Sequence, residues 1–277
     1  MLRPAGLSAS VPTRGVAFCT LGQDCGPLPA FWKRLRFAFG GLTLQATLDN
    51  RLLAALPDDV RRTVASSFEQ VRIERRAVIY QPDAPIDVVY LPIDAVISVV
   101  TVMRDGSQIE VVTVGSEGIT GAEALLTDRV ASRLTWCQVA GDAWRIPMRD
   151  FRDLCRREPA FRDLIERYIS ALLDALSQSI ACNRLHYVNE RCARWLLMTH
   201  DRVGRSEFPL THEALATMLG VRRAGVSIAA AALQHAGYIR YSRGKVTILE
   251  RAGLELVACE CYAAIEEAFA NCRRPAG

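Results

Sequence analysis

The stretch Phe208–Ile239, FPLTHEALATMLGVRRAGVSIAAAALQHAGYI, has the pattern of two helices joined by a tight turn. Thr211 suits the N-cap of the first helix because its hydroxyl can accept from a backbone N–H, and Glu213 is favourable in the first turn. Gly220 permits the sharp turn that follows, and Gly237 ends the second helix. Two helices joined by a short glycine-containing turn are typical of a helix-turn-helix, whose second helix enters the major groove of DNA.

The second helix begins at Arg222 or Arg223. In such motifs its first residues face the bases, and one arginine paired with a guanine edge contributes about 1–3 kcal/mol of discrimination. Downstream, YIRYSRGKVTIL (Tyr238–Leu249) predicts a β-hairpin wing that presents two basic side chains to the phosphate backbone. The predicted DNA-contacting residues are Thr211, Arg222, Arg223, Ser227, Arg243 and Lys245.

Charge and composition agree with this interpretation. The 277-residue chain has a net charge of +4, and residues 186–253 hold ten Arg or Lys against five Asp or Glu, as a phosphate-facing module requires. Half of the residues are hydrophobic, as in globular proteins. No apolar run is long enough to span a membrane, and the N-terminus lacks the apolar core of a secretory signal. The nine scattered cysteines favour reduced thiols in a cytoplasmic protein.

Upstream, the pattern changes twice. Residues 1–44 are rich in Gly, Pro and small residues, and we expect an extension of little structure. Residues 71–150 contain short Val- and Ile-rich runs separated by turn signals such as Arg104-Asp105-Gly106, which predict an antiparallel β-roll or barrel. A long helix is then predicted from Phe161 to about Leu185.

The long helix carries an apolar seam at alternating spacings of three and four. Such a seam is typical of coiled-coil positions, but periodicity alone favours equally a core helix packed on its own domain. The residues predicted for a dimer interface are Ile165, Tyr168, Leu172, Leu176 and Ile180.

From about Asn50 to Leu254 the chain resembles the Crp/Fnr family of bacterial transcriptional regulators, most specifically in LTHEALATMLGVRRAGVSIAAAALQHAGYIRYSRGKVTI. The resemblance implies an α+β fold: an N-terminal antiparallel β-roll (a cyclic-nucleotide-binding-like jelly roll), a long dimerisation helix and a C-terminal winged helix-turn-helix. It also implies a homodimer that binds double-stranded DNA and contacts RNA polymerase. The expected segments are the extension at 1–44, the sensor at 45–157, the dimerisation helix at 158–185, the DNA-binding domain at 186–254 and a helical tail at 255–277.

The resemblance is incomplete in the DNA-contacting helix. Arg223 matches the base-reading arginine of the family. Ala224 stands where the family often has Glu, and Ile228 stands where the cyclic-AMP-responsive members have another arginine. We therefore expect a different operator half-site.

The sensor departs further. Cyclic-nucleotide binders in the family carry a Gly-Glu pair for the ribose and, about ten residues later, an Arg followed by Ser or Thr for the phosphate. Here Gly121 is followed by Ala122, Glu123 comes one place late, and Arg133 precedes Leu134. Gly121, Glu123 and Arg133 are the candidate effector residues. The incomplete pattern argues against a cyclic nucleotide, and Glu123 and Arg133 alternatively form a surface pair.

Cysteine spacing argues against the iron–sulfur cluster of the oxygen-sensing members. Cys19 and Cys25 are clustered, but the next cysteine is Cys137, and two thiols do not make a four-thiolate site. Cys259-x-Cys261 and Cys272 are interpreted as incidental, so no metal site is predicted. His186 or a cysteine is available to a haem iron, but no pattern specifies one.

An enzyme is not predicted. Gly115-Ser116-Glu117-Gly118 is not a nucleophile elbow, His212-Glu213 lacks the second His of a zinc protease, and no phosphate-binding Gly-rich loop is present. The alternative function is a small-molecule, redox or haem sensor whose helix-turn-helix mediates protein contacts.

Overall fold

The computed structural model of the chain describes residues 49–126 and 130–274. The chain separates into two units at residue 45, and every described residue belongs to the second. The predicted extension over residues 1–44 therefore lies outside the described residues.

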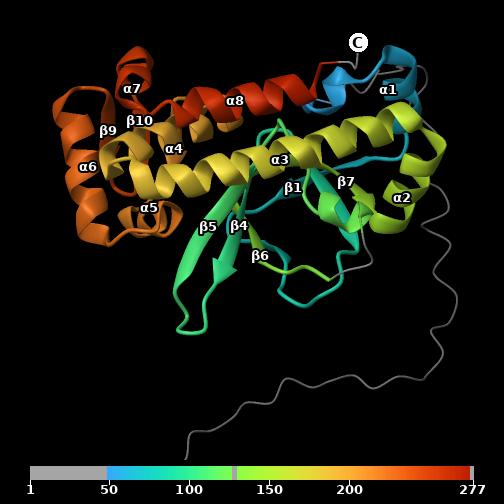
Figure 1. Cartoon of the computed structure of the whole chain (residues 1–277), viewed down its shortest axis with the longest axis horizontal. Coiled ribbons are helices and arrows are strands. Elements are labelled where there is room, and N and C mark those ends of the chain that lie inside the picture. The colour runs from blue at the N-terminus through green and yellow to red at the C-terminus, as the bar shows by residue number, and fades with distance from the viewer. Residues whose placement is uncertain (1–48, 127–129, 275–277) are drawn as a thin grey trace, which may run out of the picture. The chain divides into compact units, whose positions relative to one another are not determined.

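The first half of the described chain is an antiparallel β-roll (Figure 1). Its strands form two sheets in the orders β1-β7-β3 and β2-β6-β4-β5, and Ile73, Ile97 and Val114 form part of a small core to which both sheets contribute. The predicted α+β fold with an N-terminal β-roll is confirmed. The strands are β1 (Glu69–Ile73), β2 (Val78–Tyr80), β3 (Val88–Pro92), β4 (Val96–Val102), β5 (Gln108–Val114), β6 (Leu134–Val139) and β7 (Gly141–Pro147).

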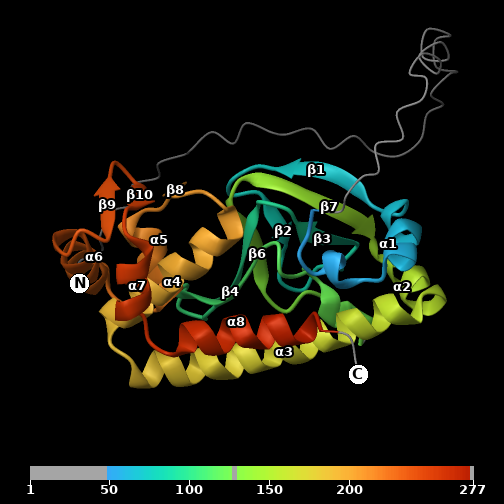
Figure 2. The ribbon, with the colours of Figure 1, turned by 90° about the horizontal axis from the view of Figure 1, so that it is seen from above.

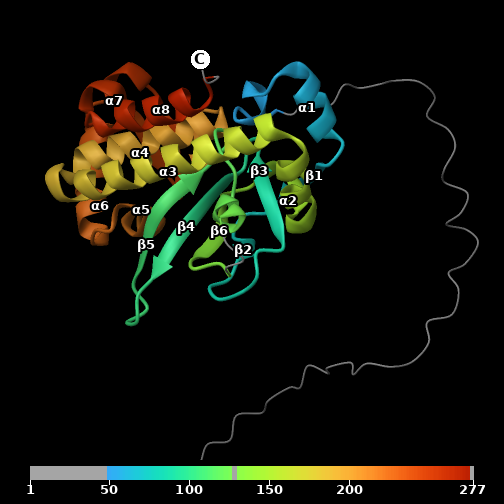
Figure 3. The same cartoon turned by 45° about the vertical axis from the view of Figure 1, so that its right-hand side comes forward.

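Helices precede, interrupt and follow the roll, and the helix-turn-helix lies in the second half of the chain (Figure 3). The early and central ones are η2 (Leu53–Ala55), α1 (Asp58–Ala65), η3 (Ala122–Leu125), α2 (Met148–Arg157) and α3 (Pro159–Leu185). The later elements are α4 (Val188–Val203), β8 (Glu207–Pro209), α5 (His212–Leu219), α6 (Arg223–His235), β9 (Ile239–Ser242), β10 (Lys245–Ile248), α7 (Arg251–Val257) and α8 (Cys261–Cys272).

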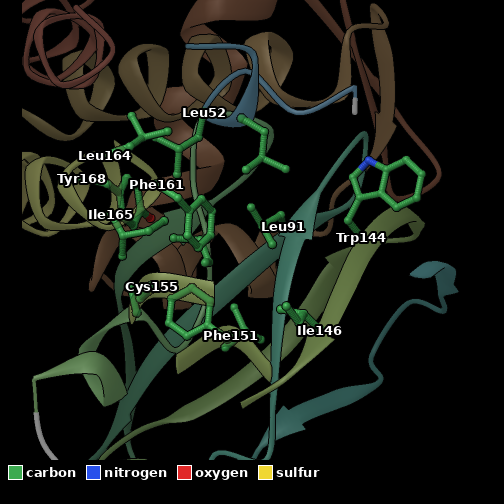
Figure 4. Close-up of a cluster of buried hydrophobic side chains, with 14 of the residues drawn as sticks. Leu52, Leu91, Trp144, Ile146, Phe151, Cys155, Phe161, Leu164, Ile165 and Tyr168 are labelled. Carbon is green, nitrogen blue, oxygen red and sulfur yellow. The ribbon is translucent and has the colours of Figure 1, made fainter. Parts of the chain in front are cut away.

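The long helix α3 runs beside the C-terminal helix α8 (Figure 2). Pro159 occupies its first turn, where the missing N–H costs nothing. Figure 4 shows the main core, in which Phe161, Ile165 and Tyr168 of α3 point toward the roll and α2. The Tyr168 ring also stacks on the Phe269 ring of α8, with a distance of 6.0 Å between the ring centroids.

This packing corrects part of the predicted dimer seam. Ile165 and Tyr168 are 0% and 1% exposed within the single chain, so they belong to its own core and cannot contact a partner. The sequence could not reveal this, because α8 and the roll cover the first turns of α3 from two sides. Farther along, Leu173 and Ile180 are 60% and 72% exposed.

Candidate nucleic-acid interface

Helices α5 and α6 are bent by 106° at the three-residue turn that begins with Gly220, within the range of a helix-turn-helix. The Thr211 hydroxyl caps α5 by accepting from Ala214 N at 3.1 Å. Gly220 ends α5 at φ +62°, a conformation that side chains disfavour. Leu215 and Val226 are fully buried where the helices meet, so apolar packing fixes the crossing.

Arg222 and Arg223 lie at the start of α6, and both are exposed. Arg222 is the N-cap residue in an extended conformation, and Arg223 opens the helix. Ile228, one turn farther along, is 73% exposed, an unusual position for a large apolar side chain. The exposed face at the start of α6 therefore combines two guanidinium groups with an apolar side chain, which suits base edges and thymine methyl groups.

Ser227 already has partners inside the protein. Its hydroxyl donates to Arg223 O at 3.1 Å and lies 3.0 Å from His212 Nδ1 of α5. The His212 ring packs at 4.5 Å from the ring of Tyr241, whose hydroxyl donates to Leu210 O at 2.6 Å. His212 and Tyr241, which were not among the predicted site residues, connect α5, α6 and the wing.

The wing is a three-stranded sheet in the order β8-β10-β9 rather than a simple hairpin. Strand β8 spans only three residues, too few for a periodic pattern. Arg243 and Gly244 form its tip with φ of 49° and 74°, and Arg243 is exposed there. Lys245 Nζ lies 2.9 Å from Glu207 Oε1, and this pair holds the pKa of Glu207 below its usual range. Lys245 therefore carries a partly neutralised charge, whereas Arg243 forms no ion pair among the described residues.

Strand β5 and the loop after it contact the DNA-binding elements directly. Arg202 of α4 donates through Nε to Glu117 Oε1 at 2.7 Å. Trp195 Nε1 of α4 donates to Glu110 Oε1 at 2.9 Å. A Cβ at Gly220 would lie 2.6 Å from Ile109 Cδ1, so the turn of the helix-turn-helix touches β5.

Glu110 is enclosed by hydrogen-bond donors. Ser98 Oγ donates to Oε2 at 2.5 Å, and Thr113 Oγ1 donates to Oε1 at 2.9 Å. Burial nevertheless raises the pKa of this carboxyl, while the hydrogen bonds from Ser98, Trp195 and Thr113 oppose the shift.

The candidate effector residues do not form a closed site. Gly121 adopts φ +71° and precedes the short helix η3, while Glu123 and Arg133 are exposed. Arg133 donates to the neighbouring Ser132 Oγ at 3.3 Å, and no ion pair links it to Glu123 in the described parts of the chain. This arrangement lacks a ribose-binding carboxylate beside a phosphate-binding guanidinium.

Residues 70–158 match the cyclic nucleotide-binding domain family, and residues 190–257 match the Crp-like helix-turn-helix domain family. The two matches together span more than half of the chain. The chain belongs to the Crp/Fnr family of transcriptional regulators. A comparison with curated protein sequences gave no match.

Solved structures of Crp/Fnr proteins share the fold. FixK2 from Bradyrhizobium japonicum is 14% identical with a TM-score of 0.60, over 69% of this chain and 98% of that one. A CRP-family regulator from Thermus thermophilus is 22% identical with a TM-score of 0.56, over 68% and 96%. The c-di-GMP-responsive regulator CLP from Xanthomonas campestris is 15% identical with a TM-score of 0.55, over 69% and 99%.

Membership of the Crp/Fnr family decides among the predicted functions. Regulators of this family bind DNA, are typically dimers and are not enzymes, so the alternative in which the helix-turn-helix serves protein contacts is not favoured. No single described helix is long and apolar enough to cross a membrane. Helices α5 and α6, which are joined by a bend, are together long and apolar enough, judged by length and composition alone.

Proposed function

We propose that this Crp/Fnr regulator places α6 in the major groove, with Arg222 and Arg223 on base edges. The observation that carries the proposal is the pair of exposed guanidinium groups at the start of a helix set at 106° to α5. Thr211, Arg243 and Lys245 contact phosphates. The Ser227 hydroxyl donates to the backbone carbonyl of Arg223, and it can donate to a phosphate only by releasing that bond.

Two copies pair along the exposed apolar face of α3. Leu173 and Ile180 are exposed, and the predicted Leu172 and Leu176 are half-buried beside them. Support comes from the spacing of three and four residues between Leu173, Leu176 and Ile180, which suits packing against a second helix. The two recognition helices then read half-sites about 34 Å apart, one turn of DNA.

A signal at the β-roll reaches α4 and α5 through β5. The proposed route consists of the pairs Glu117–Arg202 and Glu110–Trp195 and the contact of Ile109 with Gly220. An effector that shifts β5 alters the orientation of the helix-turn-helix, since buried contacts transmit small displacements. Glu123, Arg133 and Gly121 stay the predicted effector residues, and thermal shift with cyclic nucleotides, with and without Arg133→Ala, tests them.

RNA polymerase is the proposed second macromolecular partner, and the cytoplasm the proposed location. The proposed segments remain 45–157 for the sensor, 158–185 for the dimerisation helix, 186–254 for the DNA-binding domain and 255–277 for the tail.

The proposal is tested by titrating labelled DNA from the regulator's own promoter region with the full chain. Several phosphate contacts predict that affinity falls by about 10³-fold or more between 50 and 200 mM salt. Binding that is absent, or that does not respond to salt, would refute it.

A further inference from the structure

Four metal-ligating side chains converge at the end of α3. Cys182 and His186 lie one helical turn apart, and Cys259 and Cys261 come from the linker and first residue that lead into α8. We call these four residues the Cys–His cluster. Their nearest sulfur and nitrogen atoms all lie within 4.8 Å of one another.

The cluster is enclosed. Cys182 and Cys261 are fully buried, Cys259 is 7% exposed, and the side chain of His186 is 19% exposed. All three cysteines are free thiols. An apolar core would not need a histidine here, and three thiols with an imidazole are a ligand set of structural zinc sites.

Two of the six separations between ligand atoms are close to the edges of a tetrahedron around one ion, and all six lie within 4.8 Å. Cys182 Sγ lies 3.5 Å from Cys259 Sγ, and Cys261 Sγ lies 3.5 Å from His186 Nδ1. Zn–S and Zn–N bonds of about 2.3 and 2.05 Å give tetrahedral edges of roughly 3.8 Å between two sulfurs and 3.6 Å between sulfur and nitrogen. An iron–sulfur cluster distributes its ligands over several irons and would hold them farther apart.

Neighbouring groups would support such a site. The second ring nitrogen of His186, Nε2, lies 3.1 Å from a carboxylate oxygen of Glu260, which fixes the tautomer that leaves Nδ1 free to ligate. Gln178 Nε2 donates to Cys261 Sγ at 3.0 Å, as amide groups do to metal-bound thiolates. Arg191 and Arg194 of α4 bring positive charge near Cys182.

We propose that Cys182, His186, Cys259 and Cys261 bind one Zn²⁺ ion in a closed, structural site. On binding, the three thiols lose their protons to solvent and His186 ligates through neutral Nδ1. The ion ties the chain between α7 and α8 to the end of α3.

The location gives the site a consequence for DNA binding, which rests on the proposed function. Only His186 and Tyr187 separate α3 from α4, so a metal held by His186 fixes the joint between the long helix and the DNA-binding elements. Loss of the ion frees both this joint and the N-terminal end of α8.

The test is elemental analysis of the full chain, purified without chelators, for the wild type and for Cys182→Ala, Cys261→Ala and Cys272→Ala. Cys272 is a matched control because it is buried in the same helix as Cys261 but lies outside the cluster. We expect one zinc per chain in the wild type and in Cys272→Ala, and at least a tenfold loss in the other two. Metal-free wild type, or full zinc in Cys182→Ala, would overturn the proposal.

Two measurements on the wild type alone cover the case in which a variant does not fold. Replacement of the ion by Co²⁺ should give thiolate-to-cobalt charge-transfer bands and tetrahedral ligand-field bands. The thiols of Cys182, Cys259 and Cys261 should resist a thiol reagent until a chelator is added. An octahedral spectrum, or a Cys182–Cys259 disulfide in the freshly purified protein, would contradict the site. None of these measurements involves DNA, so their failure is distinct from failure of the proposed function.

Discussion

The guanidinium of Arg202 and the carboxylate of Glu117 form an ion pair at 2.7 Å, with side chains only 2% and 4% exposed. Glu117 belongs to the loop after β5, and Arg202 belongs to the helix on which the helix-turn-helix packs. A Cβ at Gly115 would collide with the Arg202 side chain, so the loop approaches α4 closely. The β-roll and the DNA-binding elements are thus joined by a buried charge pair.

Glu117→Gln should lower the free energy of unfolding by about 3–5 kcal/mol, because it removes the carboxylate that pairs directly with the buried Arg202 guanidinium. Urea unfolding measures this. Glu166→Gln is the matched control, since Glu166 pairs with Arg162 on the exposed side of α3 and should change stability by less than about 0.5 kcal/mol. Equal effects of the two substitutions would show that the buried pair has no special part in stability.

Glu110→Gln should make stability less dependent on pH. Burial raises the pKa of Glu110, so the folded chain binds this proton more tightly than the unfolded chain. The resulting stabilisation is complete below the unfolded pKa and is lost as the pH rises through the folded pKa. The Tm of the variant relative to the wild type should therefore rise over the range that begins at about pH 4.5, the ordinary pKa of a glutamate, and extends upward. A constant difference across that range would contradict the prediction.

Gly220→Ala and Gly225→Ala should have opposite effects. At Gly220, the positive φ and the close Ile109 side chain both oppose a Cβ, and we expect a loss of about 1–2 kcal/mol. At Gly225, inside α6, a Cβ meets nothing within 4 Å, and the better helix former should add about 0.4–1 kcal/mol. Denaturant unfolding of both variants checks this, and a stabilised Gly220→Ala would show that the turn does not require glycine.

Ile180→Asp should convert the dimer into a monomer, because it introduces a charge into the apolar face of α3 proposed to meet the second copy. Leu185→Asp is the control, since Leu185 is 75% exposed on the same helix, and a spacing of five residues places it about 140° around the helix from Ile180. Sedimentation velocity distinguishes the two. A dimeric Ile180→Asp protein would place the interface elsewhere.

Local patterns predicted the helix-turn-helix well, because Thr211 and Gly220 act within a few residues of their own positions. The turn at Arg104-Asp105-Gly106 was predicted from its own residues in the same way, and Gly106 adopts φ +82° there. The Cys–His cluster and the burial of Tyr168 were not predictable. Cys182 and Cys259 are 77 residues apart, and only the return of α8 along α3 brings them together.

The most direct test of the account compares Arg223→Ala with Lys245→Ala in quantitative DNA binding, using the promoter fragment and a scrambled fragment of equal length. Arg223 is proposed to read a base and Lys245 to contact phosphate. Arg223→Ala should reduce discrimination between the fragments by about 1–3 kcal/mol for each half-site of the dimer. Lys245→Ala should weaken binding to both fragments equally and reduce the salt slope by about two, because the dimer loses one phosphate contact in each subunit. Equal loss of discrimination in both variants, or unchanged discrimination in Arg223→Ala, would contradict the account.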